Sequence, residues 1–189
     1  MISRREALRL LGGACAVPAL AALTPDDLFA LGQRTHASLA KPRGSGFFDM
    51  HQLQTVAAAA DRIIPVTATP GALAAECPRF IERIVEDHYE PPRQKRFVAG
   101  LVNFDSRASA LRQRLFADLT EADRDSVLTA VEADALAAPN ARDGSFWRDL
   151  KYLTIYGYYT SRIGIQKELE TNFYPGRYDG CVPITDGAK

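Results

Sequence analysis

Residues 49–65 read DMHQLQTVAAAADRIIP, and apolar side chains recur along them at intervals of three and four residues. Such intervals place side chains on one face of an α-helix. Asp49 is of a residue type that caps helix N-termini, and Pro65 is of the type that ends helices. The apolar positions are Met50, Leu53, Val56, Ala57, Ala60, Ile63 and Ile64. The segment therefore predicts an amphipathic helix that buries one face.

The segments that follow carry the same helical spacing, separated by turn-forming residues. Pro70-Gly71 marks a loop, Pro78 fits the first turn of a second helix, and Pro91-Pro92 closes that segment. We expect Thr120 and Ser145 to cap the last two helices. The helical positions are Phe80, Ile81, Ile84 and Val85; Phe97, Leu101, Phe104, Ala108, Leu111 and Leu115; Val127, Leu128, Val131 and Ala135; and Phe146, Leu150, Leu153, Tyr156, Gly157, Thr160 and Ile163.

Strand patterns are absent, because no run of β-branched residues alternates with polar ones. From Phe173 onward, prolines and glycines predict an irregular C-terminal tail. The predicted fold class is all-α: a single bundle of about five helices over residues 47–189, ending in that tail.

The first 23 residues have the anatomy of an export signal. Arg4 and Arg5 form a positive region, an apolar stretch runs from Ala7 to Leu23, and Ala19-Leu20-Ala21 offers small residues for cleavage. The adjacent arginines resemble the twin-arginine motif, and that export route carries folded proteins. The alternatives are an N-terminal amphipathic helix and a lipid modification of Cys15.

A linker is predicted between the signal and the bundle, over residues 24–46. Thr24 can open a short helical turn that runs to Leu31. Beyond Leu31 there is little apolar periodicity, and Pro42, Gly44 and Gly46 follow.

Composition excludes several classes of protein. The chain has 189 residues, with 23 Lys and Arg against 23 Asp and Glu, so its formal net charge is zero. Nucleic-acid binding needs a concentrated excess of basic residues, and a spanning helix needs an apolar run of roughly 20 residues. Neither is present. We predict one small soluble domain without a nucleic-acid partner.

No recognised catalytic or cofactor motif is found. The sequence lacks a Cys-x-x-Cys-His haem motif, a glycine-rich nucleotide loop and a Gly-x-Ser-x-Gly elbow. His36 falls in the predicted linker, and His51 and His88 lack metal-ligand spacing. Glu82 and Glu86 lie near His88, a pattern more typical of a solvated helix face than of a metal site. We therefore predict no catalytic residue, cofactor or metal in this chain.

Two cysteines remain after signal removal, Cys77 and Cys181. In an oxidising compartment they can pair with each other, or one can pair with a partner. Cys77 also fits a buried small hydrophobic position at a helix start. Cys181 lies in a Gly-Cys-Val-Pro tail that we expect to be exposed, which slightly favours an intermolecular role.

Residues 152–160 read YLTIYGYYT and hold four of the seven tyrosines. A helix displays side chains all round, so Tyr152, Tyr156, Tyr158 and Tyr159 are not expected all to face one core. Tyrosine is enriched at protein–protein contacts, so these residues are a candidate partner interface. The alternative is that they cap the core with their hydroxyls in water. Gly157 among them predicts a close backbone approach.

Three motifs in order resemble one family. DRIIPVTATPGA at 61–72, LT at 153–154 with GYYTS at 157–161, and YPGRY at 174–178 follow the twin-arginine leader. Together they resemble the gluconate 2-dehydrogenase subunit 3 family, the small subunits of membrane-associated flavin-dependent sugar dehydrogenases. The resemblance covers about residues 49–183.

This resemblance implies a non-catalytic subunit. In the family, a large FAD-containing flavoprotein of the glucose-methanol-choline type oxidises the sugar, and a multihaem cytochrome c often takes the electrons. The large subunit usually lacks a signal and leaves with the small one through the twin-arginine machinery, so a periplasmic, membrane-associated complex is expected. The resemblance carries an intersubunit disulfide onto Cys181, while a Cys77–Cys181 bridge stays open. Tyr178 in the tail motif joins the candidate interface.

Two further alternatives concern the first motif and the function. Asp61 and Arg62 either contact the partner or its flavin region, or order the turn before Pro65, where an arginine is favourable at a helix C-terminus. We favour the structural role. The alternative function is a freestanding envelope binding module or lipoprotein without a flavoprotein partner; a small enzyme with an unrecognised site is a third. Substrate choice would belong to the large subunit.

Overall fold

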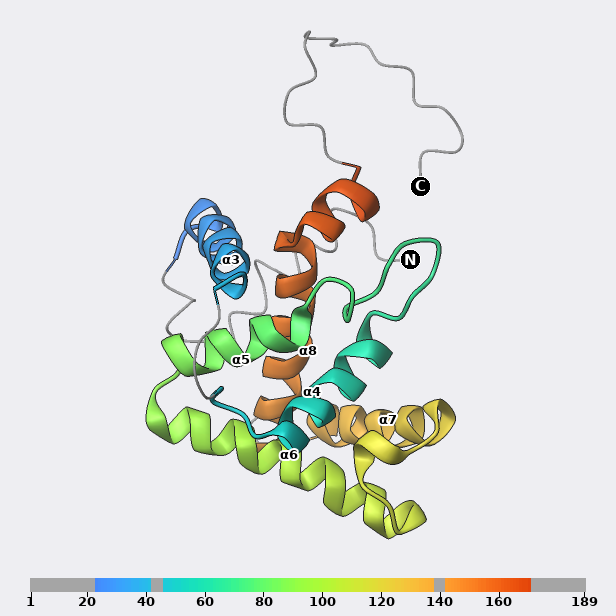
Figure 1. Cartoon of the computed structure of the whole chain (residues 1–189). Helices are drawn as coiled ribbons and strands as arrows, with labels where there is room; N and C mark the ends of the chain where they lie inside the picture. Colours follow the sequence, from blue (N-terminus) through green and yellow to red (C-terminus); the bar gives the residue numbers. More distant parts are fainter. Residues whose placement is uncertain (1–22, 42–45, 138–141, 171–189) are drawn as a thin grey trace, which may run out of the picture.

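The computed structural model describes residues 23–41, 46–137 and 142–170, and these residues contain helices and no strand. The predicted all-α class is therefore confirmed. In Figure 1, α8 runs through the middle of the molecule, with α6 and α7 towards its lower end. The elements are α3 (Pro25–Leu39), α4 (Met50–Ile63), α5 (Cys77–His88), α6 (Pro91–Arg112), the 3₁₀ helix η1 (Phe116–Asp118), α7 (Glu121–Ala137), α8 (Arg142–Thr160) and the π-helix η2 (Gly164–Glu168).

Helix α4 begins and ends where its sequence predicts. The Asp49 side chain accepts a hydrogen bond from the Gln52 backbone N–H at 2.7 Å, and the Gln52 side chain accepts one from the Asp49 N–H at 3.2 Å. This capping box satisfies two donors that a helix start otherwise leaves unpaired. The helix ends at Ile63, two residues before Pro65.

Helix α8 is the central element of the described bundle, because it contacts each of α3, α4, α5, α6 and α7. Leu150, Leu153 and Tyr156 along it are at most 1% exposed. A helix enclosed on several sides carries apolar and aromatic residues around its circumference. The position of α8 therefore explains why its sequence lacks a single apolar stripe.

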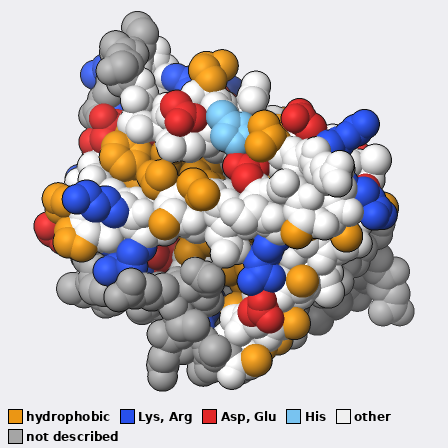
Figure 2. All heavy atoms as spheres, turned by 90° about the horizontal axis from the view of Figure 1, so that it is seen from below, with side chains coloured by type: hydrophobic (Ala, Val, Ile, Leu, Met, Phe, Trp, Pro, Cys, Tyr) orange, Lys and Arg blue, Asp and Glu red, His pale blue; other side chains and the backbone are white. Residues whose placement is uncertain are grey.

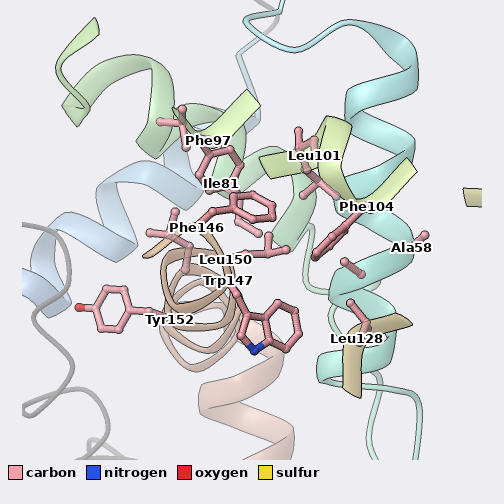
Figure 3. Close-up of a cluster of buried hydrophobic side chains, with 14 of the residues drawn as sticks. Ala58, Ile81, Phe97, Leu101, Phe104, Leu128, Phe146, Trp147, Leu150 and Tyr152 are labelled. Carbon is pink, nitrogen blue, oxygen red and sulfur yellow. The ribbon is translucent and has the colours of Figure 1, made fainter. Parts of the chain in front are cut away.

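The main core lies around α6 and α8 and is filled by aromatic rings (Figure 3). The ring centroid of Phe146 lies 5.1 Å from that of Phe97 and 5.2 Å from that of Phe104, and Trp147 lies 6.1 Å from Phe104. These separations are typical of favourable edge-to-face pairs. Gly100 lies directly against the Phe146 ring, so a side chain there would collide with it. This glycine lets α6 and α8 approach each other closely.

The segment predicted as a short turn and a linker is largely a helix, which corrects that expectation. Helix α3 runs beyond Leu31 to Leu39. The Thr24 side chain caps it by accepting from the Asp27 N–H at 3.2 Å. Thr35 interrupts the apolar pattern, but its hydroxyl donates to the Leu31 carbonyl at 2.9 Å within the helix. Thr35 therefore breaks the apolar pattern in the sequence without ending the helix, and the segment still packs on the core.

Two helix starts also differ from prediction. Pro91 and Pro92 open α6 as well as following α5, because a proline in the first turn lacks only an N–H that would have no helical partner. Helix α8 begins at Arg142, so Ser145 lies within the helix and not at its start. Thr120 does precede α7 as predicted, and its hydroxyl accepts from the Asp123 N–H at 3.3 Å.

Candidate partner surface

The segment between α4 and α5, called here the 65–76 loop, contains residues 65–72 of the first motif. It has no regular helix or strand, yet its backbone is well bonded. The Ala72 N–H donates to the Ile64 carbonyl at 2.9 Å, and the Cys77 N–H donates to the Ala72 carbonyl at 3.0 Å. Within the loop, the Thr67 N–H donates to the Thr69 carbonyl at 3.0 Å. These bonds define one conformation for a segment rich in turn residues.

The end of α8 and the π-helix η2 hold this loop from the other side. The Tyr158 hydroxyl donates to the Pro70 carbonyl at 2.8 Å. The Thr69 hydroxyl donates to the Glu168 carboxylate at 2.5 Å. The first and second motifs, far apart in the sequence, therefore meet at one end of the bundle.

Gly71 fits this junction because a side chain would not. A Cβ built on it would lie 2.6 Å from the Ile64 carbonyl oxygen and 2.7 Å from the Pro65 carbonyl carbon. Both are backbone atoms, so neither can rotate away. The Pro-Gly pair is thus required for close approach of two backbone segments as well as for a turn.

A small second core underlies the loop. It consists of the buried residues Ala60, Ala72, Ala75, Cys77 and Tyr158, with Ile64, Tyr159 and Ile163 partly buried against them. Cys77 has no exposed surface, and burial raises the pKa of its thiol to about 12. Its sulfur lies 3.7 Å from the Thr154 carbonyl oxygen. This cysteine occupies the small hydrophobic position that the sequence left open, and Cys181 lies outside the described residues.

Aliphatic side chains project from this rigid base. Val66 exposes 71% of its surface and Leu73 exposes 47%, and Tyr159 on α8 is half-buried. We call Val66, Leu73 and Tyr159 the loop face. Exposed aliphatic residues on a segment with one conformation lose little entropy on contact with a partner, which makes this face a candidate docking surface.

The predicted tyrosine interface is corrected in part. Tyr152, Tyr156 and Tyr158 are buried within this chain, at 6%, 1% and 1% exposure. The expectation that some must reach the surface assumed a helix with one covered side, whereas α8 is covered on several. Among the described tyrosines of that set, only Tyr159 keeps appreciable exposure, and Tyr178 lies outside the described residues.

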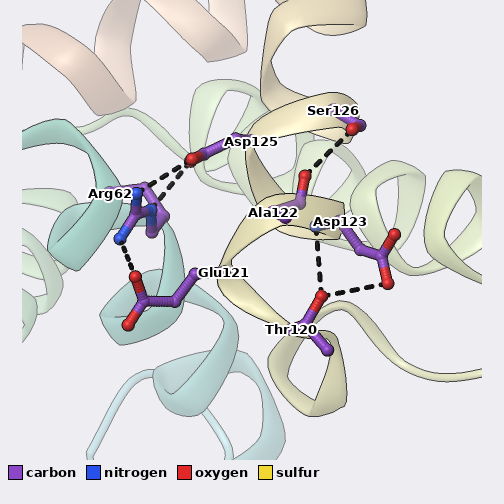
Figure 4. A network of polar contacts seen from close by, with 7 residues as sticks. All are labelled: Arg62, Thr120, Glu121, Ala122, Asp123, Asp125 and Ser126. Carbon is purple, nitrogen blue, oxygen red and sulfur yellow. Dashed lines mark hydrogen bonds and ion pairs between the residues drawn. The ribbon is translucent and has the colours of Figure 1, made fainter.

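Arg62 joins α4 to α7 (Figure 4). Its Nε and Nη2 donate to the two carboxylate oxygens of Asp125 at 2.7 and 2.8 Å, and its Nη1 donates to Glu121 at 2.7 Å. The hydrogen-bonded guanidinium lowers the pKa of Asp125. Three donors of this arginine are thus used inside the chain, which supports the structural interpretation. The sequence located the residue but not its partners, which lie about sixty positions downstream.

The histidines have separate environments. His51 Nε2 lies 2.7 Å from an Asp105 oxygen, and His36, on α3, stacks on Phe80. Glu82 accepts a hydrogen bond from the Phe48 N–H at 2.9 Å, which is a structural role for this carboxylate. Within the described ranges, no three His, Cys, Asp or Glu side chains come together as a metal site requires.

Several predicted features fall outside the described residues, namely the signal with Arg4 and Arg5, and the tail with Cys181. Of the helices in the described ranges, none is long and apolar enough to span a bilayer. What sequence reasoning missed is the loop face itself. The sequence feature that corresponds to it is a Val and a Leu on either side of a Pro-Gly turn. This feature alone does not show that the two side chains are exposed, because their exposure depends on how the loop packs on α8.

Comparison with protein families gives one match. The family model described as "Gluconate 2-dehydrogenase subunit 3" matches residues 50–180, which include α4 to α8 and the 65–76 loop. No curated protein and no solved structure matches the chain.

Proposed function

Because this chain belongs to the gluconate 2-dehydrogenase subunit 3 family, we propose that it is the non-catalytic small subunit of a periplasmic FAD-dependent sugar or sugar-acid dehydrogenase. The observation that carries the proposal is the family match, which spans most of the chain. The partner is a large flavoprotein of the glucose-methanol-choline type, in some complexes with a cytochrome c subunit. The flavoprotein holds the FAD and the substrate.

The loop face is the surface that we assign to the flavoprotein. The 65–76 loop is bonded at both its ends, and Gly71, Tyr158 and Glu168 fix its position against α8 and η2. The flavoprotein would bury Val66 and Leu73, which are otherwise left in water. Binding of this kind stabilises the large subunit by mass action.

Export is the second part of the proposed function. The leader with Arg4 and Arg5 is of the type that carries folded cargo, so a flavoprotein bound to this chain in the cytoplasm would leave with it. The twin-arginine machinery is then a transient partner of the leader, and the complex resides in the periplasm.

Co-expression tests the proposal. We expect a tagged form of this chain to recover a yellow complex from the periplasm when it is expressed together with the flavoprotein encoded by the neighbouring gene. Changing both Arg4→Lys and Arg5→Lys should leave that complex in the cytoplasm. Recovery of this chain alone, with the flavoprotein exported normally without it, would contradict the proposal and favour a freestanding binding module.

The docking surface has its own test. Val66→Asp with Leu73→Asp should abolish recovery of the flavoprotein while the melting temperature of the isolated chain stays nearly unchanged, because both side chains are exposed. Val102→Asp is the matched control, since Val102 is 57% exposed on α6. On the lower face of the molecule, apolar side chains form separate groups among polar and charged ones (Figure 2). Loss of binding in the control alone would move the docking surface to α6.

A further inference from the structure

The first described residues of the chain already belong to the folded bundle. Leu23 packs against the main core, and Thr24 caps α3, which begins at Pro25. The predicted cleavage motif, Ala19-Leu20-Ala21, ends two residues before Leu23 in the sequence. The leader itself lies outside the described residues, but the point at which it joins the bundle is set by residues that the structure describes.

The start of α3 is closed by a capping box. The Asp27 N–H donates to the Thr24 hydroxyl oxygen at 3.2 Å, and the Thr24 N–H donates to an Asp27 carboxylate oxygen at 3.3 Å. The Thr24 hydroxyl donates to the same carboxylate at 2.6 Å, and the Leu28 N–H donates to the Thr24 carbonyl at 2.9 Å. These hydrogen bonds hold Thr24 in the helix cap rather than in a free extended segment.

Helix α3 is also held along its length, because it packs on α5 and α8 (Figure 1). Leu28 and Leu31 pack against the main core, and Leu39 is 3% exposed. The Tyr156 hydroxyl on α8 donates to the Leu28 carbonyl. Detaching the first turn of α3 from the bundle would therefore break apolar contacts and hydrogen bonds together.

Cleavage of the leader needs a free, extended chain on both sides of the scissile bond, because a protease binds the substrate backbone as a strand in its cleft. Only Ala22 separates the bond after Ala21 from Leu23. Residues 22–24, fully extended, span at most about 11 Å, which is about the diameter of one helix. The enzyme would therefore have to bind residues that the folded bundle already uses for packing and capping.

We propose that the docked start of α3 shields the bond after Ala21 from signal peptidase, so that the exported chain keeps its leader. The proposal rests on the export role in the proposed function. Cleavage proceeds only from the minor form in which Leu23, Thr24 and the first turn of α3 are detached, at a rate set by the population of that form. The leader is then a lasting part of the small subunit rather than a segment removed on arrival.

Incubation of the purified full chain with signal peptidase in a mild detergent tests the shielding independently of export. A flexible Gly-Ser linker inserted between Ala22 and Leu23 moves the bond away from the bundle, so we expect this variant to lose its leader at least about tenfold faster than the wild type. The same linker inserted after Lys41, beyond α3, is the matched control and should leave the wild-type rate unchanged. Equal rates for the wild type and the first variant, whether both fast or both slow, would overturn the proposal.

A point variant tests the docking without a change in chain length. Thr24→Ala removes the cap of α3, so cleavage should become roughly fivefold faster, the factor that corresponds to loss of one helix cap. Thr120→Ala, which removes the equivalent hydroxyl at the start of α7, is the matched variant and should not change the rate. An unchanged rate in Thr24→Ala, or the same increase in both variants, would contradict shielding by α3.

The mass of the chain recovered from cells separates this proposal from the proposed function. We expect the exported wild type to have the mass of residues 1–189, and the variant with the linker before Leu23 to have lost its leader. Exported wild type without its leader would overturn the shielding and leave the export role standing. A chain confined to the cytoplasm would contradict the export role, and the incubation with purified peptidase would still decide the shielding.

Discussion

The two cores of this molecule are held together in different ways. The main core packs large aromatic rings, with Phe104 and Phe146 at 1% and 5% exposure. The small core under the 65–76 loop contains three alanines, one cysteine and one tyrosine, and its neighbouring backbone is fixed by hydrogen bonds. Burial of large side chains supplies most of the free energy of folding, so the first core determines stability. The second core determines the conformation of the 65–76 loop and therefore the shape of the loop face.

This difference has a functional consequence. A loop fixed by close backbone approach can present Val66 and Leu73 in one arrangement without contributing much to global stability. Changes in the main core should therefore lower stability without a specific effect on binding. Changes in the small core should affect the loop face first.

The largest effect is expected in the main core. Phe104→Ala should lower the free energy of unfolding by about 3–5 kcal/mol, because it removes a buried ring that contacts Phe116, Phe146 and Trp147. Urea denaturation measures the change. Val102→Ala on the same helix is the control, and its effect should stay within about 0.5 kcal/mol because Val102 is exposed. Similar losses for the two variants would mean that the ring is not part of a packed core.

An intermediate effect is expected at Gly71. Gly71→Ala places a Cβ against the Ile64 and Pro65 backbone, so the loop must shift, at a cost of about 1–3 kcal/mol. Flavoprotein binding should fall more than stability does, which a pull-down beside a denaturation curve would reveal. Ala74→Ser, in the same loop and exposed, should change neither quantity. If Gly71→Ala bound the flavoprotein as well as the wild type does, docking would not depend on the conformation of the loop.

A smaller effect is expected from two buried hydroxyls. Tyr158→Phe removes the donor to the Pro70 carbonyl and should cost about 0.5–1.5 kcal/mol, with faster hydrogen exchange over residues 65–76. Tyr156→Phe removes the donor to the Leu28 carbonyl, so faster exchange should appear in α3 instead. If both variants loosened the same segment, the contacts made by Tyr156 and Tyr158 would not be independent of each other.

The smallest effect is expected at the surface clamp between α4 and α7. Arg62→Met should cost roughly 0.2–1 kcal/mol at neutral pH, because Asp125 and Glu121 are largely solvated. Arg62 lowers the pKa of Asp125, so the clamp contributes above the ordinary carboxyl pKa of 3.8 and loses its contribution as the pH falls through the lowered value. Denaturation at pH 7 and pH 2.5 should therefore show a larger difference between wild type and variant at pH 7. Asp61→Asn is a suitable control.

The helices with a one-sided apolar pattern were predictable from the sequence, and those without one were predicted less well. In α4, the capping residue, the apolar spacing and Pro65 all predict the same helix. In α3, Thr35 and His36 face other elements through hydrogen bonds and stacking, so a pattern based on apolar residues ends too early. In α8, neighbours on several sides bury tyrosines that a one-sided helix would expose.

Local sequence was sufficient for the all-α class, for the α4 cap and for the turn at Pro70-Gly71, because spacing, capping and backbone preference act between near neighbours in the chain. The family, too, was recognisable from short motifs, and the matched range confirms it. Tertiary structure alone decided that Tyr158 supports the loop from beneath, that Arg62 joins α7, and that His36 contacts Gly157. These contacts join residues far apart in sequence, and they form only when packing around α8 brings their helices together.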